Sequence, residues 1–424
     1  MNMTYKEILP GIKLRVIEST RFETNCISVS FMAGISDEVA SNMTLLPRVL
    51  RRGTTKHPNM KCLAAALDDM YGTRIEPISR KYGDVMTSGF ICDFVDVDGD
   101  ALKNTVKLLG EILFDPMLCD GIFSEDYVSG ERVNLIDEIK SEINSKMSYA
   151  FKKINEHMFE DGSFGVDELG TEEEAEKISA KSLYRFYRKF VSEAPCEIFF
   201  CGKYSFDEVA YEVSKMFAGC QRGKIAKLAV TTPEFARGKR ICEKMDVSQA
   251  CLVIGMSADV SDIYPAKLVT SIIGGGTTSK LFTNVREKES LCYSTGATFH
   301  SFEKAMFMYA GIDPNNADIA EKAVMREFEN CVHGNITDEE ISDSKKGMID
   351  GLLTTEDSIF SMEAFWLRAS LLNDERTPSE AAAAVKNIKR EMIEKTVNDF
   401  RLSTVYLLTG TEVEKVERKL LSEH

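Results

Sequence analysis

The chain is organised around Gly274–Tyr293, which reads GGGTTSKLFTNVREKESLCY. Its three glycines follow an apolar segment and predict the end of a helix. A short helix is expected from Lys280 to Glu289, and it carries Arg286. A turn then leads into a strand that opens at Tyr293. The stretch therefore places a fixed cation and a phenol close together in sequence, which suggests a site.

A weaker copy of this pattern occurs in the first half of the chain. Gly53-Thr54-Thr55 corresponds to Gly276-Thr277-Thr278. Tyr71-Gly72-Thr73 likewise corresponds to Tyr293-Ser294-Thr295. Because the expected strands and helices follow in the same order in both halves, the sequence predicts two copies of one α+β unit.

The boundary between the two copies is expected at residues 219–239. From Gln221 onward this segment is rich in Lys, Arg, Thr, Pro and Gly and has only scattered apolar residues, which is typical of a linker. The sequence therefore predicts an N-terminal repeat over residues 1–218 and a C-terminal repeat over residues 240–424. A chain of 424 residues is long enough for two cores.

One expected strand shows a strict alternation of side chains. It runs from Cys26 to Ala33, and apolar residues on one face alternate with polar residues on the other. The apolar members are Ile27, Val29 and Phe31, and the polar members are Ser28 and Ser30.

Composition excludes several classes of partner and compartment. The formal net charge of -15 argues against nucleic acid and anionic lipid as partners. No apolar run approaches the ~18 residues needed to span a bilayer, and the N-terminus lacks the features of a signal peptide. The eleven cysteines contain no C-x-x-C pair, which favours reduced, mostly buried thiols. A cytoplasmic protein is expected.

The duplicated unit and the string from Gly274 to Tyr293 resemble the pitrilysin/insulinase family of zinc peptidases, which includes mitochondrial processing peptidase and paired bacterial peptidases. The resemblance extends along nearly the whole chain and includes GISDE at 34–38, RGTT at 52–55 and DELGT at 167–171. It implies an α+β fold of two homologous domains, each an antiparallel sheet packed against helices, that form one half of a clamshell.

The metal motif of that family is absent from its expected place. Active members carry H-x-x-E-H on a helix, which supplies two zinc ligands and a general base, and a distal glutamate supplies the third ligand. Here Thr44, Pro47 and Arg48 occupy the three motif positions, and none of them binds zinc well. Glu138 best matches the distal ligand, although a solvated or paired helix residue is the alternative. We expect no zinc in this chain and no activity of the chain alone.

The resemblance also assigns a role to Arg286 and Tyr293. In two-chain members of the family, the subunit without the motif presents an arginine and a tyrosine to the zinc of its partner. A tyrosine hydroxyl can donate to the oxyanion, and an arginine can hold substrate carbonyl oxygens with its fixed donors. The alternative is that Arg286 belongs to a solvated charge run and Tyr293 merely starts a strand.

Two further features allow a structural and a functional reading. Gly274, Gly275 and Gly276 do not fit a phosphate-binding loop and predict a flexible turn; the resemblance adds a contact with substrate. The basic residues near the motif predict a solvated helix face or, as a weaker hypothesis, a surface for an acidic segment. They are Arg48, Arg51, Arg52 and Lys56.

The expected function is that of a non-catalytic subunit of a heterodimeric zinc peptidase. Its partner would be a homologous subunit that bears H-x-x-E-H and holds the zinc, and unfolded or short peptides would bind as added strands on a sheet edge. The alternative is a peptide-binding or scaffold protein, which could be a homodimer, with no hydrolytic activity.

Overall fold

The computed structural model describes residues 2–159, 162–228 and 231–410. It forms two compact units that are discontinuous in sequence. The first contains the chain up to Ser141, Val166–Thr231 and Glu356–Glu375, and the second contains Glu142–Gly165, Thr232–Thr355 and the chain from Arg376 onward. The sequence predicts a single division of the chain, at 219–239. The end of its C-terminal repeat, residues 411–424, lies outside the described residues.

The first unit is built on a six-stranded sheet with the order β1-β2-β8-β3-β5-β4. β2 and β8 run parallel, and the other neighbouring strands are antiparallel. The strands are β1 (Asn2–Leu9), β2 (Ile12–Glu18), β3 (Thr24–Gly34), β4 (Arg74–Tyr82), β5 (Val85–Val95) and β8 (Cys196–Gly202).

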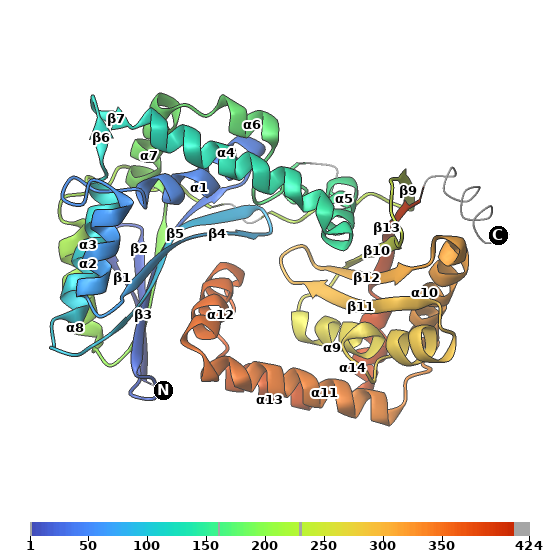
Figure 1. The fold of residues 1–424 in the computed structure, drawn as a ribbon. Coiled ribbons are helices and arrows are strands. Elements are labelled where there is room, and N and C mark those ends of the chain that lie inside the picture. Colours follow the sequence, from blue (N-terminus) through green and yellow to red (C-terminus); the bar gives the residue numbers. More distant parts are fainter. Residues whose placement is uncertain (1, 160–161, 229–230, 411–424) are drawn as a thin grey trace. The chain divides into compact units, whose positions relative to one another are not determined.

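Helices cover both faces of this sheet (Figure 1). On one face α1 (Asp37–Leu50) packs on β4 and β5, with α4 (Glu125–Ser141) and α7 (Ala180–Glu193) beside it. This face holds the main core, which includes Ile27, Val29 and Phe31 as the alternation predicts. The opposite face is covered by α12 (Ile359–Leu372), which contacts β3 and β8. The unit also contains α2 (Met60–Asp69), α3 (Ala101–Phe114), α6 (Glu172–Lys177), α8 (Phe206–Phe217) and the hairpin of β6 (Leu118–Cys119) and β7 (Ile122–Phe123).

The second unit repeats this topology with five strands in the order β11-β12-β10-β13-β9. β13 and β9 run parallel, and the other neighbouring strands are antiparallel. The order corresponds strand for strand to β4-β5-β3-β8-β2 of the first unit, including the place of the parallel pair. The strands are β9 (Lys239–Lys244), β10 (Ala250–Ala258), β11 (Cys292–His300), β12 (Ala305–Ile312) and β13 (Phe400–Thr409).

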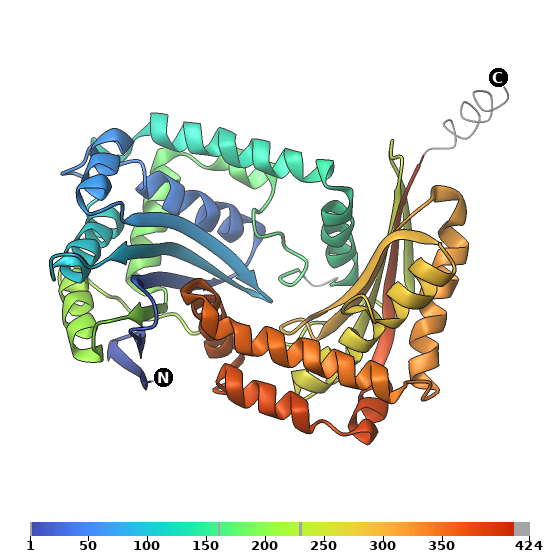
Figure 2. The same cartoon turned by 60° about the horizontal axis from the view of Figure 1, so that its bottom comes forward.

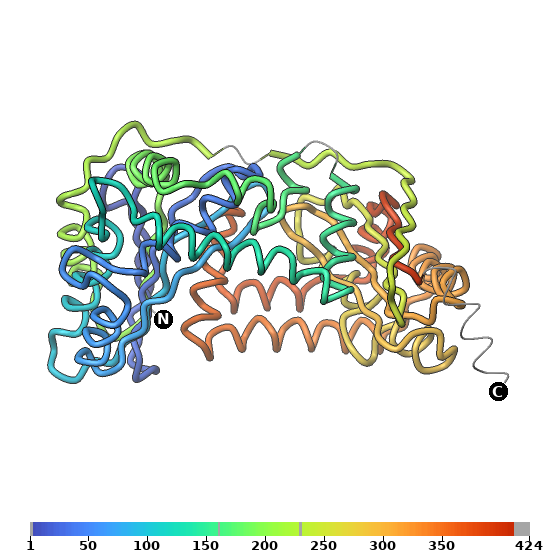
Figure 3. Tube along the Cα trace, turned by 45° about the horizontal axis from the view of Figure 1, so that its top comes forward, coloured from blue at the N-terminus to red at the C-terminus, as the bar shows by residue number. Residues whose placement is uncertain are grey.

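The second sheet is also covered on both faces. α9 (Ile263–Gly274), α10 (Ala317–Val332) and α14 (Arg390–Val397) pack together on one face. α5 (Lys146–Met158) contacts β10 and β13 on the other face (Figure 2). α11 (Asp338–Leu353) and α13 (Pro378–Asn387) lie side by side (Figure 3). The remaining segments are a π-helix, η2 (Leu281–Lys288), and the 3-10 helices η1 (Glu142–Asn144), η3 (Pro314–Asn316) and η4 (Thr354–Asp357).

The fold class predicted from the sequence is confirmed: antiparallel-rich sheets pack against helices in two units. No helix in the described ranges is long and apolar enough to cross a membrane.

Capping boxes start several helices. In each box a Ser or Thr hydroxyl and a side chain three residues later accept hydrogen bonds from each other's backbone N–H. The Ser/Thr–Glu boxes are Ser205–Glu208, Thr337–Glu340 and Thr377–Glu380.

Candidate functional site

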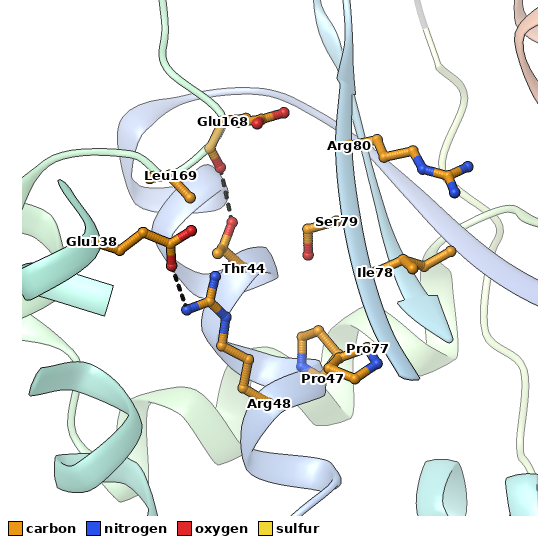
Figure 4. A pocket seen from close by; sticks show the side chains of 10 residues that line it. All are labelled: Thr44, Pro47, Arg48, Pro77, Ile78, Ser79, Arg80, Glu138, Glu168 and Leu169. Atoms are coloured by element: carbon orange, nitrogen blue, oxygen red, sulfur yellow. Dashed lines mark hydrogen bonds and ion pairs between the residues drawn. The ribbon is translucent and has the colours of Figure 1, made fainter. Parts of the chain in front are cut away.

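A pocket in the first unit brings together the four residues of the degenerate metal motif. Thr44, Pro47 and Arg48 come from α1, and Glu138 comes from α4 (Figure 4). Strand β4 and the segment before α6 complete the wall around a volume of about 290 Å³. The other lining residues are Pro77, Ile78, Ser79, Arg80, Glu168 and Leu169.

Side chains at three of the four motif positions are bound to the backbone or to each other. The Thr44 hydroxyl donates to the carbonyl oxygen of Glu168 at 2.8 Å, and Thr44 is buried. Arg48 Nη1 lies 2.7 Å from Glu138 Oε2. The guanidinium therefore neutralises the carboxylate that would otherwise be the one acidic metal donor of the motif.

Pro47 cannot act as a base, but it frees a helix carbonyl that accepts hydrogen bonds from the sheet. Because proline has no N–H, the helix lacks the bond that residue 47 would donate to the carbonyl of Met43. The hydroxyls of Ser79 on β4 and Ser88 on β5 donate to that carbonyl oxygen at 3.1 Å and 2.6 Å. The freed acceptor is thus satisfied by the two strands that α1 covers.

The residues of this pocket do not fit a zinc ion. Zinc prefers four donors from imidazole, thiolate and carboxylate. The motif positions supply a hydroxyl, a ring without a donor atom, a cation and one carboxylate that the cation already holds. Across the part of the chain that the structure describes, no group of three His, Cys, Asp or Glu side chains could hold a metal ion.

One wall of the pocket is the edge strand β4. Pro77, Ile78, Ser79 and Arg80 line the pocket. Among the residues that the structure describes, β4 pairs only with β5. Pro77 has no N–H to donate at this edge, as is common for proline in edge strands. The outer side of β4 therefore offers main-chain groups beside the motif residues.

Arg80 links this edge strand to a buried acid that sequence reasoning missed. Arg80 Nη1 lies 2.7 Å from Oε2 of Glu363 on α12, and Glu363 is fully buried. Ser28 Oγ donates to the other carboxylate oxygen at 3.0 Å. Burial alone would lower the pKa of Arg80, but the Glu363 carboxylate raises it above its usual value. The polar face of β3 was the only sequence signal for this contact.

The second unit places Arg286 on η2, the helix that follows α9, and Tyr293 at the start of β11. The expected helix is a π-helix, in which the N–H of Glu289 donates to the carbonyl of Asn284 at 3.1 Å. The Arg286 guanidinium lies over the Phe282 ring at 4.5 Å and forms no ion pair within the described residues. Tyr293 is 65% exposed, and β11 begins one residue before it.

Polar contacts to the buried Glu327 hold the π-helix against α10. Asn284 Nδ2 donates to Glu327 Oε2 at 2.7 Å, and Arg326 lies between Glu327 and Glu289. The charge run around Arg286 is exposed, and its member Glu289 is paired with Arg326. Glu327 itself is buried, and nothing in the sequence pattern pointed to it.

Two of the three glycines are required by close packing. A Cβ on Gly274 would lie 2.6 Å from the backbone carbon of Gly296, and one on Gly275 would lie 2.6 Å from Cα of Ser271. Gly276 has open space around it. Gly275 adopts a right-handed helical conformation, so room for the backbone, more than flexibility, explains these two residues.

The basic residues near the motif have partners within the first unit. Besides Arg48, Arg51 Nε donates to the Ile75 carbonyl at 2.7 Å. Arg52 pairs with Glu131 at 3.0 Å and Lys56 with Glu111 at 2.5 Å. These contacts argue against a free basic surface for an acidic segment.

Comparison with known proteins adds the family context. Residues 177–348 match the family profile described as the peptidase M16 inactive domain. A Bacillus subtilis protein described as a probable inactive metalloprotease, YmfF, is 25% identical over 411 residues, which cover 95% of this chain and 96% of that protein. An uncharacterized zinc protease of Rickettsia bellii is 22% identical over 65% of this chain and 68% of its own length.

Solved structures share the fold over nearly the whole chain. A conserved protein from Enterococcus faecalis superposes with a TM-score of 0.89 at 23% identity and covers 97% of this chain and 99% of its own. A peptidase M16 inactive domain from Pseudomonas fluorescens gives 0.80 at 15% identity, with 97% and 98% covered.

The fold and the closed motif define a peptidase-like chain of two α+β units. The comparisons confirm the resemblance to the pitrilysin/insulinase peptidases, which are the M16 peptidases. This chain is similar to M16 peptidases over nearly its whole length, and its residues 177–348 match the domain that is described as inactive in that family.

Proposed function

We propose that this chain is the non-catalytic subunit of a two-chain zinc peptidase and that Arg286 and Tyr293 act at the active site of its partner. One contrast carries the proposal. The metal-motif positions are closed by Pro47 and by the Arg48–Glu138 pair, whereas Arg286 has no ion pair among the described residues and Tyr293 is exposed.

The proposed roles follow from the chemistry of peptide hydrolysis. Hydrolysis of a peptide bond passes through an oxyanion, to which the Tyr293 hydroxyl would donate a hydrogen bond. Zinc held by the partner would activate the attacking water. The Arg286 guanidinium can hold neighbouring carbonyl oxygens of the substrate. Zinc, its ligands and the general base would come from a homologous partner that bears H-x-x-E-H, and this chain would hold no metal.

The open edge of β4 supports the binding of peptide by this chain. An extended peptide that adds to an edge strand gains main-chain hydrogen bonds with little demand on its sequence. Because Pro77 interrupts the donors of β4, such a peptide would bond on either side of this residue. Gly276, which has space around it, is the glycine of the loop that a substrate could approach.

The test is purification of the chain with its natural companion, followed by peptide cleavage assays with and without that companion. In the reconstituted pair, Tyr293→Phe should lower kcat about 100-fold, because one oxyanion donor contributes about 3 kcal/mol. Tyr211→Phe is the matched control, since Tyr211 is also an exposed tyrosine, at 64%, but lies on α8. Equal rates for both variants would refute the role of Tyr293.

The identity of the companion separates this proposal from a scaffold protein. A companion with H-x-x-E-H and one equivalent of zinc supports the peptidase subunit. A homodimer that binds peptide and cleaves nothing supports the alternative. Cleavage by the isolated chain that EDTA abolishes and zinc restores would contradict both.

A further inference from the structure

A second groove lies in the first unit and shares no lining residue with the motif pocket. Its volume is about 730 Å³, within the range of ~300–1,000 Å³ that is common for small-molecule sites. α7 forms one wall, the first turns of α1 and the end of β3 form another, and the end of α6 and residues 226–228 complete the lining.

The floor of this groove is apolar. Phe186 and Phe190 stack with ring centroids 5.3 Å apart and an interplanar angle of 19°. Met32, Val39 and Leu228 extend the apolar lining. Such a surface gains free energy when it covers apolar side chains of a ligand, roughly 25 cal/mol per Å².

The walls carry charges of both signs. Arg185, Lys189 and Glu193 lie at steps of four residues along α7, so they project from one face of the helix. None of these three side chains forms an ion pair within the residues that the structure describes. Glu38, at the first turn of α1, and Lys227 likewise form no ion pair within the described residues.

The spacing of these charges sets the length of a ligand. With a rise of ~1.5 Å per residue, the α7 backbone advances about 12 Å between Arg185 and Glu193. An extended peptide covers about 3.3 Å per residue, so three or four residues span this distance. A ligand with a carboxylate at one end and an ammonium at the other would match the opposite charges of Arg185 and Glu193.

We propose that this groove binds a short free peptide of three or four residues with apolar side chains. Its C-terminal carboxylate pairs with Arg185 and Lys189, its N-terminal ammonium pairs with Glu193, and its side chains cover Phe186 and Phe190. A fatty acid or another simple anion fits less well, because it would bring no positive charge to Glu193. The site needs neither a partner chain nor cleavage.

The test is calorimetric titration of the full chain with the tetrapeptide Leu-Ala-Phe-Leu. Binding with free termini is expected, and the same peptide acetylated and amidated should bind at least tenfold more weakly. Arg185→Glu with Lys189→Glu should abolish binding. The control is Lys181→Glu with Arg188→Glu, which makes the same charge change on exposed residues of α7 outside the groove and should bind normally.

Several results would overturn the proposal. Equal binding of the blocked peptide would show that the charged termini are not recognised, and tighter binding of decanoate would indicate an anion site. Phe186→Ala should weaken binding at least fivefold, whereas a peptide added to the edge of β4 would be insensitive to this variant. Because no partner is present, failure here leaves the proposed subunit function standing, and failure of that function leaves this site standing.

Discussion

Pro47 stands at the motif position where active relatives of the resembled family have a glutamate, and it lacks both a carboxylate and a backbone N–H. A glutamate at this position would be a general base, but proline removes both the carboxylate and a helical N–H. The Met43 carbonyl then bonds to Ser79 and Ser88, so the change at residue 47 is built into the contact between α1 and the sheet.

This arrangement predicts coupling between Pro47 and Ser88. Ser88→Ala should lower the free energy of unfolding of the first unit by about 1 kcal/mol, because a buried acceptor loses its shorter bond. In a Pro47→Ala background the restored N–H can bond Met43, so the loss should shrink by at least about 0.5 kcal/mol.

A urea-unfolding double-mutant cycle measures this coupling. Ser30→Ala is the control, since Ser30 is also a buried strand serine but its hydroxyl has no hydrogen-bond partner among the described residues. Additive effects of Pro47→Ala and Ser88→Ala would contradict the argument.

A second buried acid lies under α12. Glu197 on β8 accepts hydrogen bonds from Ser370 at 2.8 Å and from Tyr5 at 3.0 Å. The Arg15 guanidinium lies between the rings of Tyr5 and Trp366, at 3.9 Å and 4.4 Å. Burial raises the pKa of Glu197 although both hydrogen bonds oppose the shift.

The raised pKa predicts a pH dependence. Above the unfolded pKa of about 4.3, the folded state binds more protons at Glu197 than the unfolded state does. This contribution to the free energy of unfolding is complete below that pH and is lost as the pH rises through the folded pKa. Glu197→Gln has no titrating group at this position, so its free energy of unfolding does not fall for this reason as the pH rises. The stability of the variant relative to the wild type should therefore increase from pH 4.5 to pH 7.

Urea titrations at several pH values test this prediction. Glu176→Gln, an exposed change in the same unit, is the control and should leave the pH profile unchanged. A constant difference between Glu197→Gln and wild type across the range would contradict the predicted sign.

At the scale of elements, the π-helix is the feature that sets the position of Arg286. A π-helix gives up regular helical bonding and therefore needs support from its surroundings. Two contacts supply that support. Asn284 donates a hydrogen bond to Glu327, and the buried Lys280 forms an ion pair with Glu340 at 2.8 Å.

Removal of Glu327 should therefore loosen this segment selectively. We expect Glu327→Ala to speed amide hydrogen exchange at least tenfold across residues 284–291, which corresponds to about 1.4 kcal/mol. Glu329→Ala, an exposed change on the same helix, is the control. Unchanged exchange in the Glu327 variant would show that the π-helix does not depend on this acid.

At the scale of the whole molecule, each unit takes a helix from the other half of the chain. α12 covers the polar face of the first sheet, and α5 covers a face of the second. The Tyr149 and Tyr406 hydroxyls donate to Glu243 at 2.8 Å and 2.5 Å, so α5, like α12, is bound through a carboxylate.

A fragment of residues 2–231 should consequently fail to form a cooperative unit. It lacks α12, so Arg15, Ser28 and Glu197 lose their cover and partners. We expect weak near-UV circular dichroism and binding of a hydrophobic dye. Addition of a peptide of residues 356–375 should restore a cooperative thermal transition.

The matched control is the same peptide with Glu363→Ala and Trp366→Ala, which should restore far less. If the fragment alone melted as cooperatively as the complex, the first half would be an independent domain, as a single division at 219–239 implies.

Much of this architecture could be predicted because its signals are local. Alternation in β3, the glycine–tyrosine pattern in both halves and the chemistry of Thr44, Pro47 and Arg48 are all visible within short windows. The fold class and the resemblance to zinc peptidases rest on such patterns. The π-helix was missed because its eight residues are too few to distinguish the longer repeat of a π-helix from that of an α-helix.

Sequence alone established the duplicated α+β unit and the wrong side-chain chemistry for a zinc site. It could not show that Ser28 and Glu197 would be buried, because α12, which covers them, follows more than a hundred residues later in the chain. The same holds for Met43, Glu363 and the groove along α7. Their partners are set by packing between distant segments, and no local pattern of residues encodes which segments will meet.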